Sequence, residues 1–124
     1  METKTQTGYL VLADISGYTF FLANTELEHA DIALGYLLES IVGKLSAALT
    51  ISKLEGDAVF AYVDDSKLPT GSSLLDLIDD TYLAFRKEAE ALHRRATCPC
   101  KACQAIPTLD LKFKIGRASC RERV

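Results

Sequence analysis

The segment at residues 8–18, GYLVLADISGY, constrains the fold of this chain of 124 residues more than any other. Its apolar run from Tyr9 to Ala13 predicts a central strand buried on both faces, because such strands lack the polar residues that alternate in half-exposed ones. Asp14 ends this run, and Ser16 and Gly17 then break the strand and lead toward a helix. The sheet is therefore expected to start with a strand, an aspartate and a turn.

Apolar spacing along the rest of the chain predicts long helices, a hairpin and a final strand. The expected elements, in chain order, are a strand at 8–14, helices at 19–23 and 26–48, strands at 49–54 and 57–63, a helix at 73–95 and a strand at 108–113. The second long helix is marked by an apolar stripe from Leu75 to Leu92. The order β-α-α-β-β-α-β predicts an α+β domain with the ferredoxin-like, split βαβ arrangement.

This topology brings two distant aspartates together. In the ferredoxin-like arrangement the first strand lies antiparallel to the third, so the end of one sits beside the start of the other. Asp14 ends the first strand and Asp57 starts the third, so both carboxylates are expected at one rim of the sheet. A divalent cation such as Mg²⁺ relieves the repulsion between two carboxylates, with phosphates or water completing its coordination. The helix start after Asp14 adds backbone N–H groups that favour an anion.

Two short motifs at these positions resemble those of a known enzyme family. Residues 14–19, DISGYT, resemble the D-I-x-G-F/Y-T signature of class III nucleotidyl cyclases, and residues 53–57, KLEGD, resemble their K-x-x-G-D hairpin. The spacing between the motifs and the helix that separates them also fit. The resemblance covers residues 8–63 well and residues 72–113 by the order of elements, and the chain is similar to a bacterial subgroup with a cysteine-bearing loop before the last strand.

The resemblance implies a role for each matching residue. The implied metal ligands are Asp14, Asp57 and the Ile15 carbonyl, which would hold two Mg²⁺ or Mn²⁺ ions. The implied nucleotide contacts are the backbone amides of Gly17, Tyr18 and Thr19, which would bind phosphates, and the Lys53 side chain, which would read the adenine edge. With Asp14 and Asp57 as the catalytic carboxylates, the ribose 3′-hydroxyl would attack the α-phosphorus of ATP and expel pyrophosphate.

Family sites lie between two subunits, so the resemblance implies a homodimer for the full-length protein. The family's transition-state Asn and Arg follow the last strand, and this chain ends before a matching segment. The chain itself is therefore expected to be inactive, while its full-length parent would convert ATP to cyclic AMP and pyrophosphate. The alternative is a non-catalytic module of the same fold that binds a nucleotide, dimerises or regulates.

Each motif also has a purely structural interpretation. An Asp-Ile-Ser-Gly sequence after a strand is typical of an Asx turn into a helix, and a Gly-Asp pair is common in hairpins. Lys53 taken alone is typical of a solvated strand residue. The two motifs in combination favour the functional interpretation over the structural one.

The four cysteines raise a separate possibility. Cys98, Cys100 and Cys103 cluster before the last strand, and His93 precedes them by five residues, so the four side chains form a candidate Zn²⁺ set. Their C-x-C-x-x-C spacing is not a common zinc-finger pattern, which favours reduced loop thiols over a metal site or a thiol-based metal sensor.

Composition narrows the class of protein further. The formal net charge is −3, and an acidic balance argues against a nucleic-acid groove and suits a protein that recruits cations. No apolar run approaches the ~20 residues that cross a bilayer, and the first residues do not match a signal peptide. We therefore expect a cytoplasmic protein with neither a nucleic-acid nor a membrane partner.

The domain boundaries follow from the two ends of the chain. Residues 1–7 are polar and expected to be disordered, and residues 8–114 form the partial cyclase-like domain. Residues 115–124, IGRASCRERV, resemble the in-frame translation of a common DNA-sequencing adapter. On that interpretation the natural gene was cut near Lys114, and Cys120 belongs to the artefact.

Overall fold

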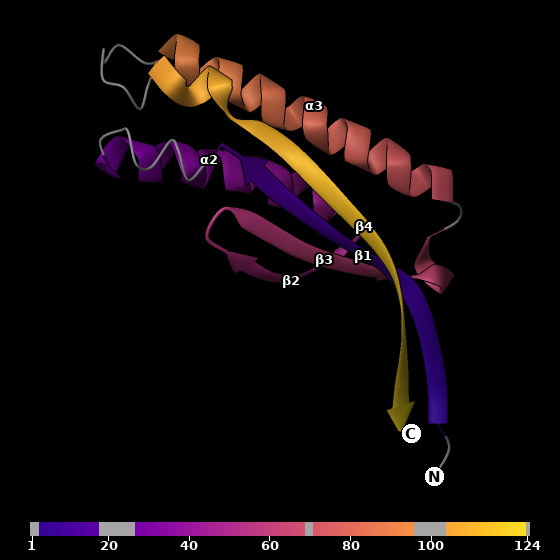
Figure 1. Cartoon of the computed structure of the whole chain (residues 1–124). Helices are drawn as coiled ribbons and strands as arrows, with labels where there is room; N and C mark the ends of the chain where they lie inside the picture. Colours follow the sequence, from indigo (N-terminus) through magenta and orange to yellow (C-terminus); the bar gives the residue numbers. More distant parts are fainter. Residues whose placement is uncertain (1–2, 18–26, 69–70, 96–103, 124) are drawn as a thin grey trace.

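A computed structural model describes residues 3–17, 27–68, 71–95 and 104–123 of the chain. Two long helices pack on one face of a four-stranded antiparallel sheet (Figure 1). The elements are β1 (Thr3–Ser16), α2 (Leu27–Leu45), β2 (Thr50–Glu55), β3 (Ala58–Asp64), the 3₁₀ turn η1 (Asp65–Lys67), α3 (Gly71–Arg95), the 3₁₀ turn η2 (Ile106–Thr108) and β4 (Asp110–Arg123). The α+β class expected from the sequence is confirmed.

The strand order is β2-β3-β1-β4, and each neighbouring pair is antiparallel. This is the predicted ferredoxin-like order, with β1 inside the sheet between β3 and β4. The pairing of β1 with β3 begins at Gly8 opposite Asp64 and ends at Asp14 opposite Ala58. The far end of β1 therefore lies beside the start of β3.

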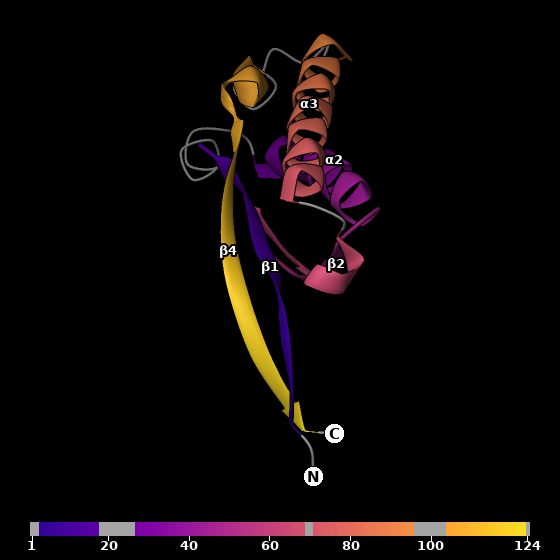
Figure 2. The ribbon, with the colours of Figure 1, turned by 90° about the vertical axis from the view of Figure 1, so that its right-hand side faces the viewer.

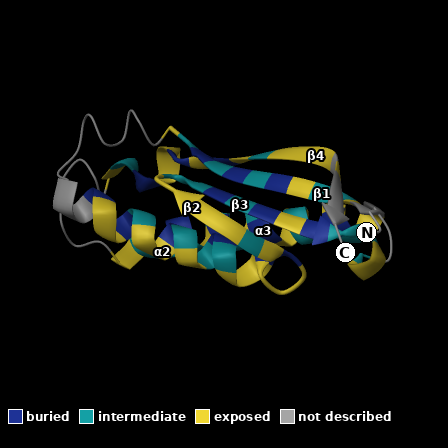
Figure 3. Cartoon of the chain, turned by 90° about the horizontal axis from the view of Figure 1, so that it is seen from below, coloured by how far each residue is buried: buried dark blue, intermediate teal, exposed yellow. Residues whose placement is uncertain are grey.

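Burial alternates along β1, in contrast to the continuous burial that its apolar run predicted. Val11, Ala13 and Ile15 are almost fully buried beneath the helices, whereas Leu10 keeps 52% of its surface exposed. Figure 2 shows both helices on the same side of the sheet, and Figure 3 shows the resulting alternation along the strands. The expectation of two covered faces was wrong, because an antiparallel sheet can keep one face open and the described helices cover only one.

The helices bury apolar stripes against the sheet and each other. The stripe of α2 includes Ala33, Leu37, Ile41 and Leu45, in the region where the sequence predicts it. On α3 the prediction was wrong at its first position, because Leu75 is 57% exposed and Leu74 is buried instead. The α3 stripe then continues through Thr81, Phe85 and Ala89. Thr81 tolerates complete burial because its hydroxyl donates a hydrogen bond of 2.7 Å to the Leu77 carbonyl.

The hairpin between β2 and β3 lies where the sequence predicts it. Gly56 has a φ of +54°, in the left-handed region that glycine adopts without steric cost. An irregularity between Ile51 and Lys53 shifts the β2 register by one residue. Asp57 follows Gly56 in the turn, immediately before β3.

The two outer ends of the chain extend further than expected. β1 begins at Thr3 instead of residue 8, and β4 continues to Arg123 instead of ending at residue 113. Their pairing runs from Thr3 opposite Arg123 to Ser16 opposite Asp110, and the two strands project together beyond the helices (Figure 1). Strand pairing does not report on the origin of a sequence, so the adapter interpretation of residues 115–124 stays a prediction that the nucleotide sequence tests.

The described helices carry no segment long and apolar enough to cross a bilayer. The helix expected at residues 19–23 and most of the cysteine-bearing loop lie outside the described residues.

Candidate metal and nucleotide site

The structure brings Asp14 and Asp57 together at one rim of the sheet. Asp14 pairs with Ala58, and the backbone N–H of Ile15 donates a hydrogen bond of 3.0 Å to the Asp57 carbonyl. The two aspartates thus occupy adjacent chain segments although 43 positions separate them in the sequence. The juxtaposition results from the antiparallel β1–β3 pairing, as the topology argument required.

Proximity of the two carboxyl groups changes their electrostatics. The pKa of Asp14 is raised by partial burial first, then by the negative charge of Asp57, and then by a hydrogen bond between the two carboxyl groups. The positive charges of Lys114 and Lys112 act in the opposite direction on the same pKa. The charge of Asp57 thus disfavours the ionised form of Asp14, and a cation bound at this rim would relieve that effect.

The two lysines on β4 were not identified from the sequence. Lys112 lies directly opposite Asp14 in the β1–β4 pairing, and Lys114 lies opposite Leu12. The sequence predicts a strand at residues 108–113, but no local pattern specifies its register against β1. The register that sets the buried Ile15 opposite Leu111 also sets Lys112 beside Asp14.

The turn after β1 is described only in part. The Ile15 side chain is buried and anchors the end of the strand, and Gly17 has a φ of +89°. A side chain at Gly17 would be strained by that φ, so the glycine has a conformational reason beside any functional one. Tyr18 and Thr19, the other expected phosphate contacts, lie outside the described residues.

Lys53 lies two strands away from β1. Its ammonium forms an exposed ion pair of 3.2 Å with Glu55 and stands 4.8 Å from the centre of the Phe60 ring, its partner in the β2–β3 pairing. These contacts agree with the structural interpretation of Lys53 and leave its role with adenine a prediction.

The donor set fits a hard divalent cation. Two carboxylates in contact supply the oxygen ligands that Mg²⁺ and Mn²⁺ prefer, with phosphate or water as further ligands. In the ranges that the structure describes, no group of three or more His, Cys, Asp or Glu side chains could hold a metal by itself. The site therefore suits an ion that arrives with its own oxygen ligands, as a nucleotide-bound Mg²⁺ does.

The zinc hypothesis is not resolved by the described residues. His93 lies exposed in the last turn of α3. Cys98, Cys100 and Cys103 all fall within the range 96–103, which the structure does not describe.

An apolar pocket lies on the open face of the sheet next to this rim. Its volume is about 370 Å³, and its lining includes Leu10, Leu12, Phe60, Tyr62 and Lys114. Leu10 and Tyr62 each expose about half of their surface. Large apolar side chains that remain uncovered on a sheet face are typical of ligand or subunit contacts.

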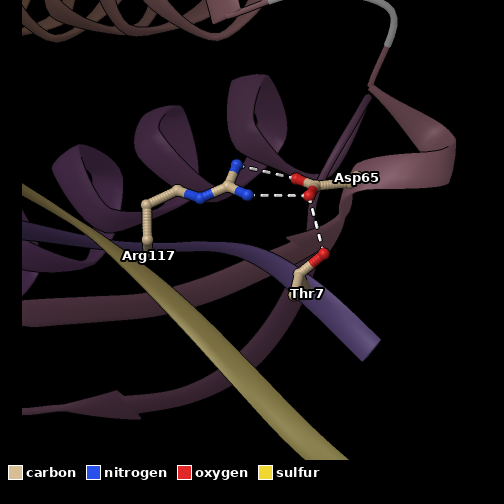
Figure 4. A network of polar contacts seen from close by, with 3 residues as sticks. All are labelled: Thr7, Asp65 and Arg117. Atoms are coloured by element: carbon tan, nitrogen blue, oxygen red, sulfur yellow. Dashed lines mark hydrogen bonds and ion pairs between the residues drawn. The ribbon is translucent and has the colours of Figure 1, made fainter. Parts of the chain in front are cut away.

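A second polar cluster lies at the other end of the β1–β3 pairing, near the middle of β1 (Figure 4). Arg117 donates two hydrogen bonds of 2.9 and 2.8 Å to the Asp65 carboxylate, and the Thr7 hydroxyl donates a third of 2.8 Å. The guanidinium also stands 4.5 Å from the centre of the Tyr9 ring. The hydrogen bond from Thr7, followed by the contact with Arg117, lowers the pKa of Asp65. This carboxylate is satisfied within the protein, so it serves structure.

Solved structures share the fold of this chain. The adenylyl cyclase CyaB from P. aeruginosa matches with a TM-score of 0.66 and 20% identity, over 98% of this chain and 60% of that one. The guanylyl cyclase Cya2 matches with a TM-score of 0.73 and 12% identity, over 96% and 57% of the two chains. A class III adenylyl cyclase-like ATP-binding protein from Pseudomonas aeruginosa matches with a TM-score of 0.65 and 20% identity, over 94% and 26%.

At these identities the likeness shows the fold of class III cyclase domains and leaves the chemistry open. This chain spans at most 60% of the three solved chains. A comparison with curated proteins gives no match.

The sequence comparison is more specific about family. A family model described as a protein of unknown function, DUF2652, matches residues 34–121. The matched range includes the second half of α2, the hairpin that carries Asp57, α3 and most of β4. The chain, which has the fold of class III nucleotidyl cyclase domains, belongs to the DUF2652 family.

Proposed function

We propose that this domain is a cyclase-like module that binds a nucleoside triphosphate, with ATP favoured, together with two Mg²⁺ or Mn²⁺ ions. In the full-length parent, acting as a homodimer, the module would convert ATP to cyclic AMP and pyrophosphate. The observation that carries the proposal is the juxtaposition of Asp14 and Asp57 beside the Gly17 turn, where the Ile15 N–H donates a hydrogen bond to the Asp57 carbonyl. The shared fold with adenylyl and guanylyl cyclases supports it.

The proposal assigns each residue a task that its chemistry allows. Asp14 and Asp57 hold the divalent ions, with the Ile15 carbonyl as a further ligand. Backbone amides at Gly17, Tyr18 and Thr19 donate hydrogen bonds to the phosphates. When bound, the metal ions neutralise phosphate charge and lower the pKa of the ribose 3′-hydroxyl. Lys53 contacts the base by exchanging its exposed partner Glu55 for a ring acceptor.

The open face of the sheet supports the homodimer in this proposal. Leu10 and Tyr62 expose apolar surface there, and the 370 Å³ pocket lies between them. A second subunit over this face would remove the apolar surface from water and complete the site, because Asp14 and the pocket lie on the same face of β1.

A second candidate is nucleotide binding without catalysis. One solved structure with this fold is itself described as a cyclase-like ATP-binding protein. Both candidates require the carboxylate pair, and they differ in whether cyclic AMP and pyrophosphate are formed.

Calorimetric titration of ATP with Mn²⁺ into the chain and into Asp57→Asn tests the shared requirement. The variant is expected to lose affinity by about tenfold or more, since one of the two acidic ligands is neutralised. Asp79→Asn, an exposed position on α3, is the matched control and should bind as the parent chain does. Equal affinity in the chain and in Asp57→Asn would refute the paired-carboxylate site.

Parallel titrations with GTP and an assay for cyclic AMP and pyrophosphate separate the remaining alternatives. ATP-selective binding with cyclic AMP formed by the full-length dimer would support the cyclase. Binding without any product from that dimer would support the non-catalytic module.

A further inference from the structure

Two lysines on β4, Lys112 and Lys114, have no role in the proposed function. Lys112 lies directly across from Asp14 and Lys114 directly across from Leu12. Residues directly opposite on antiparallel strands share a face, with Cβ atoms about 5 Å apart, and diagonal neighbours lie about 7–8 Å apart. Both ammonium groups are therefore within reach of the carboxylate rim.

Both lysines stand on the open face. Leu109 and Leu111 are buried beneath the helices, so the residues that alternate with them, Lys112 and Lys114, face away from the core. Asp14 alternates in the same way with the buried Ala13 and Ile15. On the open face, Asp14 and Lys112 therefore stand directly opposite each other, beside the turn that carries Asp57.

These lysines do not neutralise the aspartates by direct pairing. The ion pairs within 4 Å among the described residues involve Lys53, Arg95 and Arg117 as cations. Lys112 and Lys114 act on Asp14 only through space, where their positive charges oppose the repulsion from Asp57. Lys114 also lines the apolar pocket and therefore lies between the pocket and the aspartate rim.

Charge balance indicates what such a pair would bind. Two carboxylates and a nucleoside triphosphate carry about six negative charges at neutral pH, and two divalent ions offset about four of them. Two ammonium groups beside the carboxylates supply the charge that remains. A lysine suits this task because its ammonium is a compact point charge that binds phosphate without a fixed geometry.

We propose that Lys112 and Lys114 bind the phosphate chain of the metal-bound nucleotide, and through it the pyrophosphate product, alongside the Asp14–Asp57 pair. The inference deepens the proposed function and rests on it. It adds to the turn amides a second phosphate contact that comes from β4 instead of β1.

Removing these charges should affect the metal and the phosphate in opposite directions. In Lys112→Gln/Lys114→Gln, Mn²⁺ alone should bind as well as or more tightly than in the parent chain, because two repelling cations have gone. Inorganic pyrophosphate with Mn²⁺ should bind about tenfold more weakly or worse, because two charged hydrogen-bond donors are lost. Lys112→Arg/Lys114→Arg should restore most of the pyrophosphate affinity, and Lys87→Gln on α3 should change neither titration.

Calorimetric titration of Mn²⁺, and of pyrophosphate in saturating Mn²⁺, measures both quantities on the same samples. A double variant that keeps parental pyrophosphate affinity would overturn this inference and leave the proposed function standing. Loss of Mn²⁺ and pyrophosphate binding together would assign the lysines a structural role and also overturn it. A parent chain that binds neither pyrophosphate nor ATP would overturn both proposals.

Discussion

The two ends of the β1–β3 pairing place a carboxylate in opposite surroundings. Where the pairing begins, Asp65 receives hydrogen bonds from Thr7 and Arg117, and its pKa is lowered. Where the pairing ends, Asp14 lies beside a second carboxylate, that of Asp57, and the pKa of Asp14 is raised. The first cluster is complete within the chain, whereas no cation of the described residues forms an ion pair with the second.

This difference assigns a structural role to the Asp65 cluster and a functional role to the Asp14–Asp57 pair. A satisfied ion pair ties β1 and β4 to η1, far from the rim. Two adjacent carboxyl groups repel each other when both are charged, which folding alone does not require, and such arrangements concentrate at functional sites. Asp65 therefore serves as an internal control for the proposal that Asp14 and Asp57 bind a metal ion.

The largest expected effects come from neutralising one aspartate at each end. Asp14→Asn should weaken the binding of ATP with Mn²⁺ by about tenfold or more, yet raise the free energy of unfolding by less than about 1 kcal/mol, because repulsion is removed from a screened site. Asp65→Asn should lower stability and leave nucleotide affinity unchanged. Calorimetry measures the nucleotide affinity of both variants, and urea denaturation measures their free energy of unfolding. A loss of stability in Asp14→Asn would contradict the assigned repulsion between Asp14 and Asp57.

Gly8→Ala should cost about 1–3 kcal/mol of unfolding free energy. A Cβ at this position would collide with the Val63 carbonyl oxygen of the neighbouring strand, so the β1–β3 pairing must shift. Gly35→Ala on α2 is the matched control, because its Cβ would meet open space and a helical alanine is preferred by about 1 kcal/mol. Urea denaturation that ranked the two glycine variants equally would contradict the close β1–β3 approach.

Arg117→Lys should destabilise the chain, by less than Gly8→Ala does. Lysine keeps the charge but loses the two parallel hydrogen bonds to Asp65 and the planar contact with Tyr9. Thermal unfolding measures the loss of stability, and Arg117→Met should lower the unfolding midpoint at least as much as Arg117→Lys does. Unchanged midpoints in both variants would remove the stabilising role assigned to this cluster.

The smallest expected effect is a difference in pH dependence. The folded-state pKa of Asp65 is below its ordinary 3.8, so its stabilising contribution is present above that pH and lost as the pH falls through the lowered pKa. The folded-state pKa of Asp14 is above 3.8, so its penalty is present at neutral pH and disappears as the pH falls toward 3.8.

Urea denaturation of the parent chain, Asp14→Asn and Asp65→Asn from about pH 7 to about pH 3 therefore gives two difference curves of opposite sign. Difference curves of the same sign would contradict the assigned pKa directions.

The features of the fold that depend on local sequence pattern were predicted from the sequence. Helical spacing and the Gly56 hairpin placed the elements, and the ferredoxin-like order then placed Asp14 beside Asp57. The open face of β1 was missed, because an apolar run does not tell which of its faces a helix will cover. Leu10 is the residue that reveals the error.

The remaining features that the sequence did not predict depend on the register between strands that are distant in the chain. Lys112 was overlooked because its position beside Asp14 depends on the β1–β4 pairing, which no local pattern specifies. The Asp65–Arg117 pair links positions 52 residues apart, and Arg117 lies in the segment that the adapter interpretation set aside. The contact of Arg117 also requires a β4 that is longer than the strand predicted at residues 108–113.

Paramagnetic broadening by Mn²⁺ with ATP, observed on aspartate carboxyl carbons labelled with ¹³C, tests the central claim most directly. The account predicts that the Asp14 and Asp57 resonances broaden together at the same low Mn²⁺ concentration, while that of Asp65 stays sharp. Broadening of only one of the two, or of Asp65 to the same extent, would contradict a shared metal site.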